Sequence, residues 1–195
     1  MTIPSLMTDI NNKVLAISLK NNATSIQSLI GEELSKNKTN DLAHTDFSSA
    51  EKLLTKDYFD ALKICIPETS LKECWKLKSG DDYAGEIKYK TLAGTDVVNF
   101  GKARSVILKN GAVISYHING EDALGSFYGV FGIDVNGSDG PNILCRDFFS
   151  ILITRNGKII GANDGADRDT LVQNSKYSLA NCFSLVMRDN WKIKY

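Results

Sequence analysis

The sequence predicts an α+β domain in which a long N-terminal amphipathic helix packs on an antiparallel sheet. Apolar residues recur at a helical period near the N-terminus, and strand-like runs separated by Gly, Asn and Asp follow Arg104. We find no helical pattern of useful length between those runs. Helices first and strands afterwards is the order typical of an α+β domain with an antiparallel sheet.

The length of 195 residues favours a single domain. We divide it into a helix at 4–35, a connecting region at 36–103 with a short helix and a cysteine loop, and a sheet with the C-terminal segment at 104–195. The 23 basic and 23 acidic residues cancel, so no net charge indicates nucleic acid or an anionic membrane as a partner. The chain as printed has no apolar run long enough for a membrane span and is expected to be soluble.

The first predicted helix is unusually long. At 1.5 Å per residue it measures about 45 Å, more than the diameter of a small domain. Part of it should therefore project, exposing Leu6, Ile10 and Val14, and a projecting end needs a partner. The apolar residues that define the helix are Leu6, Ile10, Val14, Ile17, Ala23, Ile26, Leu29, Ile30 and Leu34.

A second, shorter helix is predicted in the connecting region. Ser48 and Glu51 have the spacing of a capping box. A helical stripe follows and ends before Pro67. Its members are Leu53, Leu54, Tyr58, Leu62 and Ile64.

The four cysteines have no zinc-site spacing, and composition alone leaves disulfides and buried free thiols equally open. Cys65 and Cys74 enclose eight residues, which indicates a small disulfide loop. Cys145 and Cys182 are a second candidate pair, by exclusion and because both lie in the predicted sheet region.

The firmest local prediction is a β-hairpin after Arg104. The runs SVILK and AVISYHI are joined by Asn110 and Gly111, a pair favoured in short hairpin turns. Further strand-like runs are FYGVFGIDV, FFSILIT, KIIGA and CFSLVMRDNWKIKY.

Common enzyme motifs are absent from the sequence, including phosphate-binding loops, HExxH and GxSxG. His117 would need an orienting acid and a nucleophile to act as a base, so a surface histidine is the simpler interpretation. We therefore expect no catalytic residue and no enzymatic activity.

A glycine-rich segment after the third predicted strand has oxygen donors at alternating positions, which is what Ca²⁺ requires. The segment is no EF-hand, and its Asp and Asn side chains could instead cap their own backbone. A second acidic turn at 163–169 could add ligands or be a solvated loop. The candidate calcium ligands are Asp134, Asn136, Ser138, Asp139, Asn142 and Asp147.

Three segments together resemble bacterial type IV pilins and the related pseudopilins of type II secretion. They are IPSLMTDINNKV at the start, FGIDVNGSDGPNILCRDFFSILIT in the sheet region, and CFSLVMRDNWKI near the end. The most specific element is DVNG-x-x-GPN-x-x-x-R-D-x-F, in which Cys145 stands where glycine is more usual.

This resemblance implies a pilin-like domain with a roughly four-stranded antiparallel sheet. It also implies a structural subunit of an extracellular or periplasmic filament in the cell envelope, with oxidised cysteines. Its partners would be other copies of itself, related pilin subunits, and the pilus or secretion machinery. The membrane segment of such proteins would precede Thr2-Ile3-Pro4. In pseudopilins a calcium ion commonly lies in a loop between strands, which adds weight to the candidate site.

Two functional classes follow from the sequence. One is a filament subunit with no chemistry of its own, either a pilin or a pseudopilin. The other is a freestanding secreted module, either one that binds a partner through calcium or an enzyme that uses His117 with nearby acids. Coding sequence upstream of Met1 distinguishes them, because the filament class requires an apolar segment there.

Overall fold

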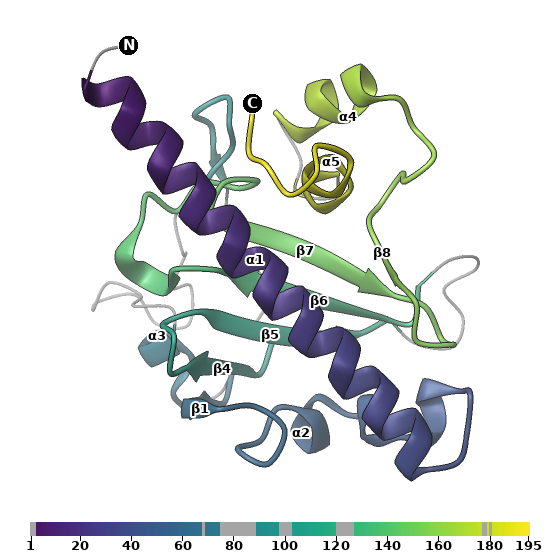
Figure 1. Ribbon diagram of the computed structural model, residues 1–195. Coiled ribbons are helices and arrows are strands. Elements are labelled where there is room, and N and C mark those ends of the chain that lie inside the picture. Colours follow the sequence, from purple (N-terminus) through teal and green to yellow (C-terminus); the bar gives the residue numbers. More distant parts are fainter. Residues whose placement is uncertain are drawn as a thin grey trace.

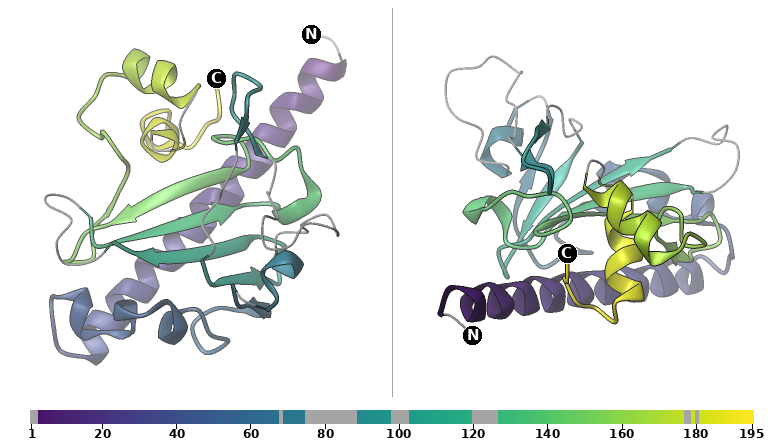
Figure 2. Two further views of the ribbon diagram at one scale, coloured as in Figure 1. Left: turned by 180° about the vertical axis from the view of Figure 1, so that it is seen from behind. Right: turned by 90° about the horizontal axis from the view of Figure 1, so that it is seen from above.

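The computed structural model describes residues 3–67, 69–74, 89–97, 103–119, 127–176, 179 and 181–195. Its two main layers are a long helix and a sheet (Figures 1 and 2). Helix α1, Ile3–Lys36, crosses one face of the sheet diagonally, and its N-terminal end extends beyond the strands (Figure 1). The view from above shows α1 as a separate layer against that face (Figure 2).

The sheet has six strands in the order β1-β4-β5-β6-β7-β8, and every neighbouring pair is antiparallel. The bounds are β1 Ala61–Cys65, β4 Ser105–Leu108, β5 Val113–Ile118, β6 Gly129–Asp134, β7 Phe148–Ile153 and β8 Ile159–Ile160. A separate two-stranded sheet pairs β2 Tyr89–Lys90 with β3 Asp96–Val97. The expected strand count of about four is therefore wrong, although the fold is compatible with the α+β class.

The count was wrong partly because β1 was assigned to the predicted second helix. That helix, α2, spans only Ala50–Leu53, and Ser49 rather than Ser48 caps it by accepting the Glu51 N–H at 3.1 Å. The chain then turns and pairs Ala61–Cys65 with β4. The pairing is tertiary and overrides the helical spacing of Leu62 and Ile64.

The C-terminal run was also misassigned. Residues Cys182–Arg188 form helix α5, which packs with helix α4, Arg168–Ser175, beside β7 (Figure 1). Cys182, Phe183, Leu185 and Val186 are all buried, so the segment shows neither strand alternation nor a polar helix face. A short apolar run of this kind does not distinguish strand from helix.

Short helical elements complete the connections. They are η1 Leu42–His44, η2 Asp46–Ser48, α3 Leu71–Cys74 and η3 Gly137–Asp139. Strands β4 and β5 are joined through Asn110 and Gly111, as the sequence predicts, with Gly111 at a φ of 87°. Only glycine adopts that backbone region without strain.

The core lies between α1 and the sheet. Cross-strand neighbours Tyr116, Phe131 and Ile151 occupy one face of the central strands and are at most 1 % exposed. Residues alternating with them, such as His117 and Leu152, face the other side and are exposed or half-buried. This period of two directs one apolar face of the sheet toward α1.

The two ends of α1 are fixed differently. At the C-terminal end, Glu33 is 1 % exposed and accepts hydrogen bonds from Lys36, Tyr58 and the Asp46 N–H at 2.9, 2.8 and 3.1 Å. Further toward the N-terminus, Ser18 donates to the Val135 carbonyl at 3.1 Å. Closer still to the N-terminus, Asn12 donates to the Ile193 carbonyl at 3.4 Å.

Candidate functional site

Helix α1 has two apolar faces in its N-terminal half. One face is buried on the domain through Leu15, Ala16 and Leu19. The other is exposed on the opposite side of the helix. It consists of Met7, Ile10, Val14 and Ile17, which are 60, 51, 59 and 59 % exposed. We call these four residues the α1 stripe.

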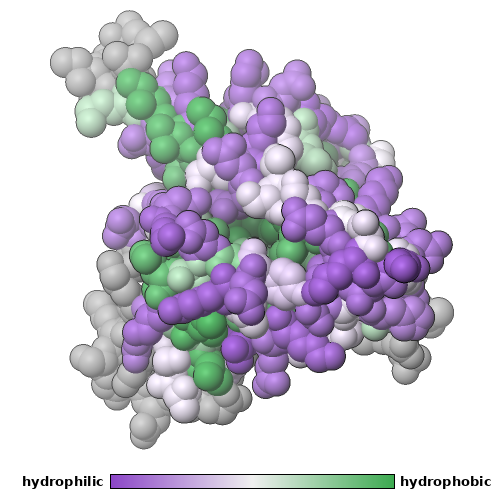
Figure 3. Space-filling model, turned by 60° about the horizontal axis from the view of Figure 1, so that its bottom comes forward, coloured by the Kyte–Doolittle hydropathy of each residue, from purple (hydrophilic) through white to green (hydrophobic). Residues whose placement is uncertain are grey.

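The spacing of the α1 stripe is that of a helix-packing seam. Steps of three, four and three residues match the alternating a and d positions of a heptad. Figure 3 shows apolar surface gathered at this end of α1. Four large apolar side chains contiguous on one helix are more than the scattered exposure normal for a soluble surface.

The sequence analysis treated the nine apolar residues of this helix as one amphipathic pattern, and that interpretation is wrong. Its expectation that the projecting end exposes Ile10 and Val14 is confirmed. The side chain of Leu6, which was expected to be exposed with them, lies outside the described residues. Ile10, Val14 and Ile17 are exposed, whereas Ala23, Ile26, Leu29 and Ile30 are buried. The two sets lie on different sides of the helix because the phase of the apolar pattern changes between Ile17 and Ala23. This change of phase is visible in the sequence, but the sequence analysis treated the apolar residues on both sides of it as one helix face.

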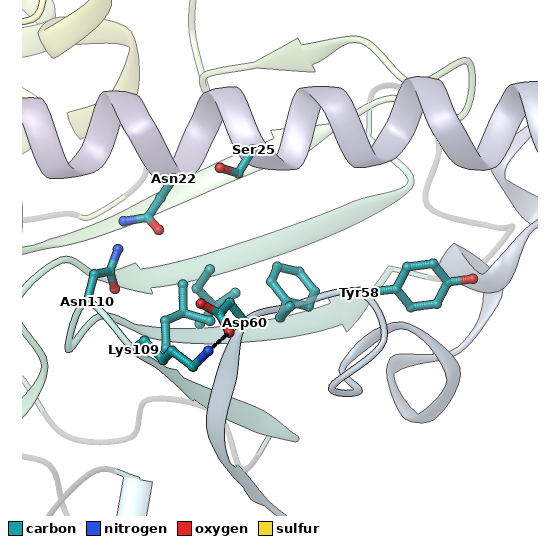
Figure 4. A pocket seen from close by; sticks show the side chains of 9 residues that line it. Asn22, Ser25, Tyr58, Asp60, Lys109 and Asn110 are labelled. Atoms are coloured by element: carbon teal, nitrogen blue, oxygen red, sulfur yellow. Dashed lines mark ion pairs between the residues drawn. The ribbon is translucent and has the colours of Figure 1, made fainter.

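A groove of about 540 Å³ lies between the middle of α1 and the β4–β5 turn (Figure 4). We call it the α1–hairpin groove. Its apolar part is formed by Phe59, Leu108 and Ile114. The remaining lining residues are Asn22, Ser25, Tyr58, Asp60, Lys109 and Asn110.

The polar edge of the groove is held by a few direct contacts. Asp60 and Lys109 form an ion pair of 2.6 Å, and both side chains are mostly exposed. Asn22 is 3 % exposed and donates to the Ser18 carbonyl at 2.9 Å. In Figure 4, Asn22 and Ser25 point from α1 toward the hairpin side of the groove. Sequence reasoning did not find this groove, because its lining comes from three separate segments.

The predicted calcium ligands lie at the last residue of β6, Asp134, and in the segment that joins β6 to β7. Asp147 is buried and accepts the backbone N–H groups of Asn142 and Ile143 at 2.7 and 2.6 Å. Asp134 is also buried and accepts the Tyr89 hydroxyl and the Asn136 N–H. Both carboxylates therefore accept hydrogen bonds from other groups of the protein.

The other candidate ligands are engaged in different ways. The Asn136 amide nitrogen donates to the Gly140 carbonyl at 2.7 Å, while its buried oxygen has no hydrogen-bond partner among the described residues. Asp139 is exposed, Asn142 is engaged through its backbone, and the Ser138 side chain lies outside the described residues. Within the described part of the chain, no three His, Cys, Asp or Glu residues are grouped as metal ligands. This arrangement fits a self-capping loop better than a calcium cage, so calcium stays a prediction of the sequence.

The electrostatics of this loop follow from burial. Burial raises the pKa of Asp134 to about 7, opposed by the Tyr89 hydrogen bond and assisted by the negative charge of Asp147. Burial also raises the pKa of Asp147, although the Ile143 and Asn142 N–H groups oppose it. The pKa of Tyr89 is raised too, by burial and by Asp134.

The second acidic turn has its own structural contacts. Asp164 accepts the Ser184 hydroxyl at 2.6 Å and the Gly161 N–H at 3.2 Å. Asp167 caps α4 by accepting the Thr170 N–H at 2.9 Å. These contacts join the turn to α4 and α5 and account for Asp164 and Asp167 without a ligand.

Both predicted cysteine pairs are disulfide-bonded. Cys65–Cys74 joins β1 to α3, and Cys145–Cys182 joins the segment before β7 to α5. His117, the only residue weighed for catalysis, is exposed on β5. In the described residues no helix is both long enough and apolar enough to span a bilayer.

Comparisons with known proteins identify no relative. The chain matches no protein-family model, no curated protein and no solved structure.

Proposed function

We propose that this chain is a structural subunit of an extracellular or periplasmic helical filament, of the pilin or pseudopilin type. The observation that carries the proposal is the α1 stripe. An exposed heptad seam on a helix that extends past its own sheet favours packing against another helix. The resemblance of the sequence to type IV pilins and pseudopilins supports the same function.

The arrangement of α1 separates the two tasks that a filament subunit must perform. Leu15, Ala16 and Leu19 attach the helix to its own domain. On the opposite side, the α1 stripe is free to contact neighbouring subunits. Its partners would be other copies of the chain and related subunits, brought together by the pilus or secretion machinery. In this function the protein performs no chemical reaction.

The rival function, a freestanding calcium-dependent binding module, is less well supported. It needs the loop between β6 and β7 to present oxygen atoms to a cation. Asp134 and Asp147 instead accept hydrogen bonds from Tyr89 and from the backbone. We therefore do not adopt it.

The proposal is tested in the organism that carries the gene. An epitope tag is followed by immunoelectron microscopy on sheared surface or periplasmic filaments, and label along filaments is expected. Val14→Asp should abolish incorporation, because it places a charge in the α1 stripe. Since Val14 is 59 % exposed, the variant should retain the melting temperature of the parent protein.

Asn11→Asp is the matched control, because it puts the same new charge on an exposed position of α1 outside the stripe. Filaments should incorporate it normally. Absence of label from every filament, or equal incorporation of the Val14→Asp and control variants, would contradict the proposed function.

A further inference from the structure

We propose that the α1–hairpin groove receives the α1 stripe of a second copy of this chain. This inference rests on the proposed function and names the surface of the domain that a neighbouring helix contacts. Its starting point is that the chain carries two apolar features of opposite shape. One is the convex stripe near the end of α1, and the other is the concave groove beside the middle of the same helix.

The groove has the size and chemistry to accept apolar side chains. Its volume of about 540 Å³ is within the range of protein pockets that bury a ligand. Phe59 and Ile114, at 7 and 1 % exposed, form a firm apolar base. The hydrophilic edge would stay in contact with water around an inserted side chain, as the rim of a protein interface does.

The charges beside the two features are complementary. Asp9 and Lys13 lie one helical turn apart, on one flank of the α1 stripe, and are exposed. The groove edge carries Lys109 and Asp60. An inserted helix exchanges partners with this ion pair, setting Asp9 against Lys109 and Lys13 against Asp60. Such pairs contribute register and orientation more than affinity.

The symmetry of such a contact agrees with a filament. The stripe and the groove are different surfaces, so each copy uses its stripe on one neighbour and its groove on the other. A heterologous contact of this kind does not close on itself unless the rotation forms a ring. It therefore extends into an open helical array, whereas stripe-to-stripe pairing would end at a dimer or small bundle.

Photo-crosslinking tests the contact directly. A benzophenone amino acid replaces Val14, and an equal mixture of unlabelled and ¹⁵N-labelled chain is irradiated at high protein concentration. We expect crosslinked peptides between light and heavy copies that join position 14 to residues 22–25 or 108–110. The same probe at Asn11, outside the stripe, should give far fewer of these products.

Charge exchange provides a second, independent readout. Lys109→Glu should lower the yield of the position-14 crosslink about twofold to fivefold. Adding Asp9→Lys should restore the yield, while Lys52→Glu, an exposed reversal away from the groove, should leave it unchanged. All variants are first checked for an unaltered melting temperature.

The outcomes separate this inference from the proposed function. Crosslinks that join position 14 only to residues 7–17 of another copy would overturn the groove contact and leave the filament function standing. A yield at position 14 no higher than at the control position would also overturn it. Insensitivity to Lys109→Glu would refute the charge register. The filament function itself is decided by the electron-microscopy experiment.

Discussion

At the scale of single residues, the loop between β6 and β7 shows that acidic side chains can serve the fold itself. Asp147 accepts hydrogen bonds from two backbone N–H groups, and Asp134 accepts one from the Tyr89 hydroxyl, which belongs to the small second sheet. Oxygen-rich spacing that suggests a cation site thus also suits a turn that satisfies its own donors. A cation site and a self-capping turn are distinguished by the groups toward which each carboxylate points.

The buried Asp134 predicts a measurable dependence of stability on pH. Burial raises its pKa from 3.8 to about 7, so the folded protein retains a proton that the unfolded chain releases. Stability from this residue is fully present below pH 3.8 and is lost as pH rises to about 7, by on the order of a few kcal/mol. Asp134→Asn should remove this part of the slope, measured as urea midpoints across that pH range.

Asp57→Asn is the matched control, because it makes the same change at an exposed position away from this loop. Its pH profile should follow that of the parent. A profile of Asp134→Asn that is parallel to the parent would show that Asp134 is already ionised in the folded protein.

At the scale of elements, α1 depends on specific attachments as well as on apolar burial. The contacts of Glu33 join its C-terminal end to the 46–58 segment. At the β7–β8 turn, a Cβ on Gly157 would lie 2.6 Å from the Ile30 side chain. The turn therefore approaches α1 more closely than any other residue type would allow.

The Glu33 attachment gives the second prediction. Glu33→Gln keeps the shape but places an amide group among the donors from Lys36, Tyr58 and Asp46. We expect the free energy of unfolding to fall by about 2–3 kcal/mol near neutral pH. Although burial raises the pKa of Glu33, the hydrogen bond from Lys36 and its other contacts lower it on balance. Its contribution is therefore present above pH 4.5 and is lost as pH falls.

Glu32→Gln tests whether this loss is specific, because the adjacent side chain is exposed. The control should change stability by less than about 0.5 kcal/mol. In urea titrations, the gap between Glu33→Gln and the parent should narrow in acid. Equal stability of the two Gln variants near neutral pH would mean that the Glu33 contacts contribute nothing net.

At the scale of the whole molecule, the two disulfides tie peripheral segments to the sheet. Their sequence separations are 9 and 37 residues. Removing Cys65–Cys74 by double substitution to Ala should lower the unfolding free energy by about 3 kcal/mol in the chain-entropy model, and removing Cys145–Cys182 by about 4 kcal/mol. Urea unfolding of the two double variants measures the difference.

Peptide mapping of the unreduced parent checks the pairing on which this prediction depends. Each fragment should contain Cys65 with Cys74, or Cys145 with Cys182. A fragment joining Cys65 to Cys145 or Cys182 would refute the pairing. It would also refute the prediction that the Cys145–Cys182 double variant loses more unfolding free energy than the Cys65–Cys74 one.

The sequence by itself determined the features that depend on local pattern. The long first helix and the β4–β5 hairpin at Asn110 and Gly111 could be predicted, because residues close together in the sequence specify each of them. The α+β class was predicted from helices that precede the strands, and the fold is compatible with that class although α4 and α5 follow the strands. The disulfide between Cys65 and Cys74 could be predicted because few residues separate the two cysteines.

Only the tertiary structure decided the rest, because partners distant in the sequence select among locally equal alternatives. Pairing with β4 made Ala61–Cys65 a strand. The helix at Cys182–Arg188 was not predicted, because it is buried on nearly all sides and its apolar run shows no helical period. Contact with the domain buried one apolar face of α1 and left the α1 stripe in solvent. Likewise, spacing placed Asp134 and Asp147 in one loop, but the packing of Tyr89 and the path of the backbone turned their carboxylates inward.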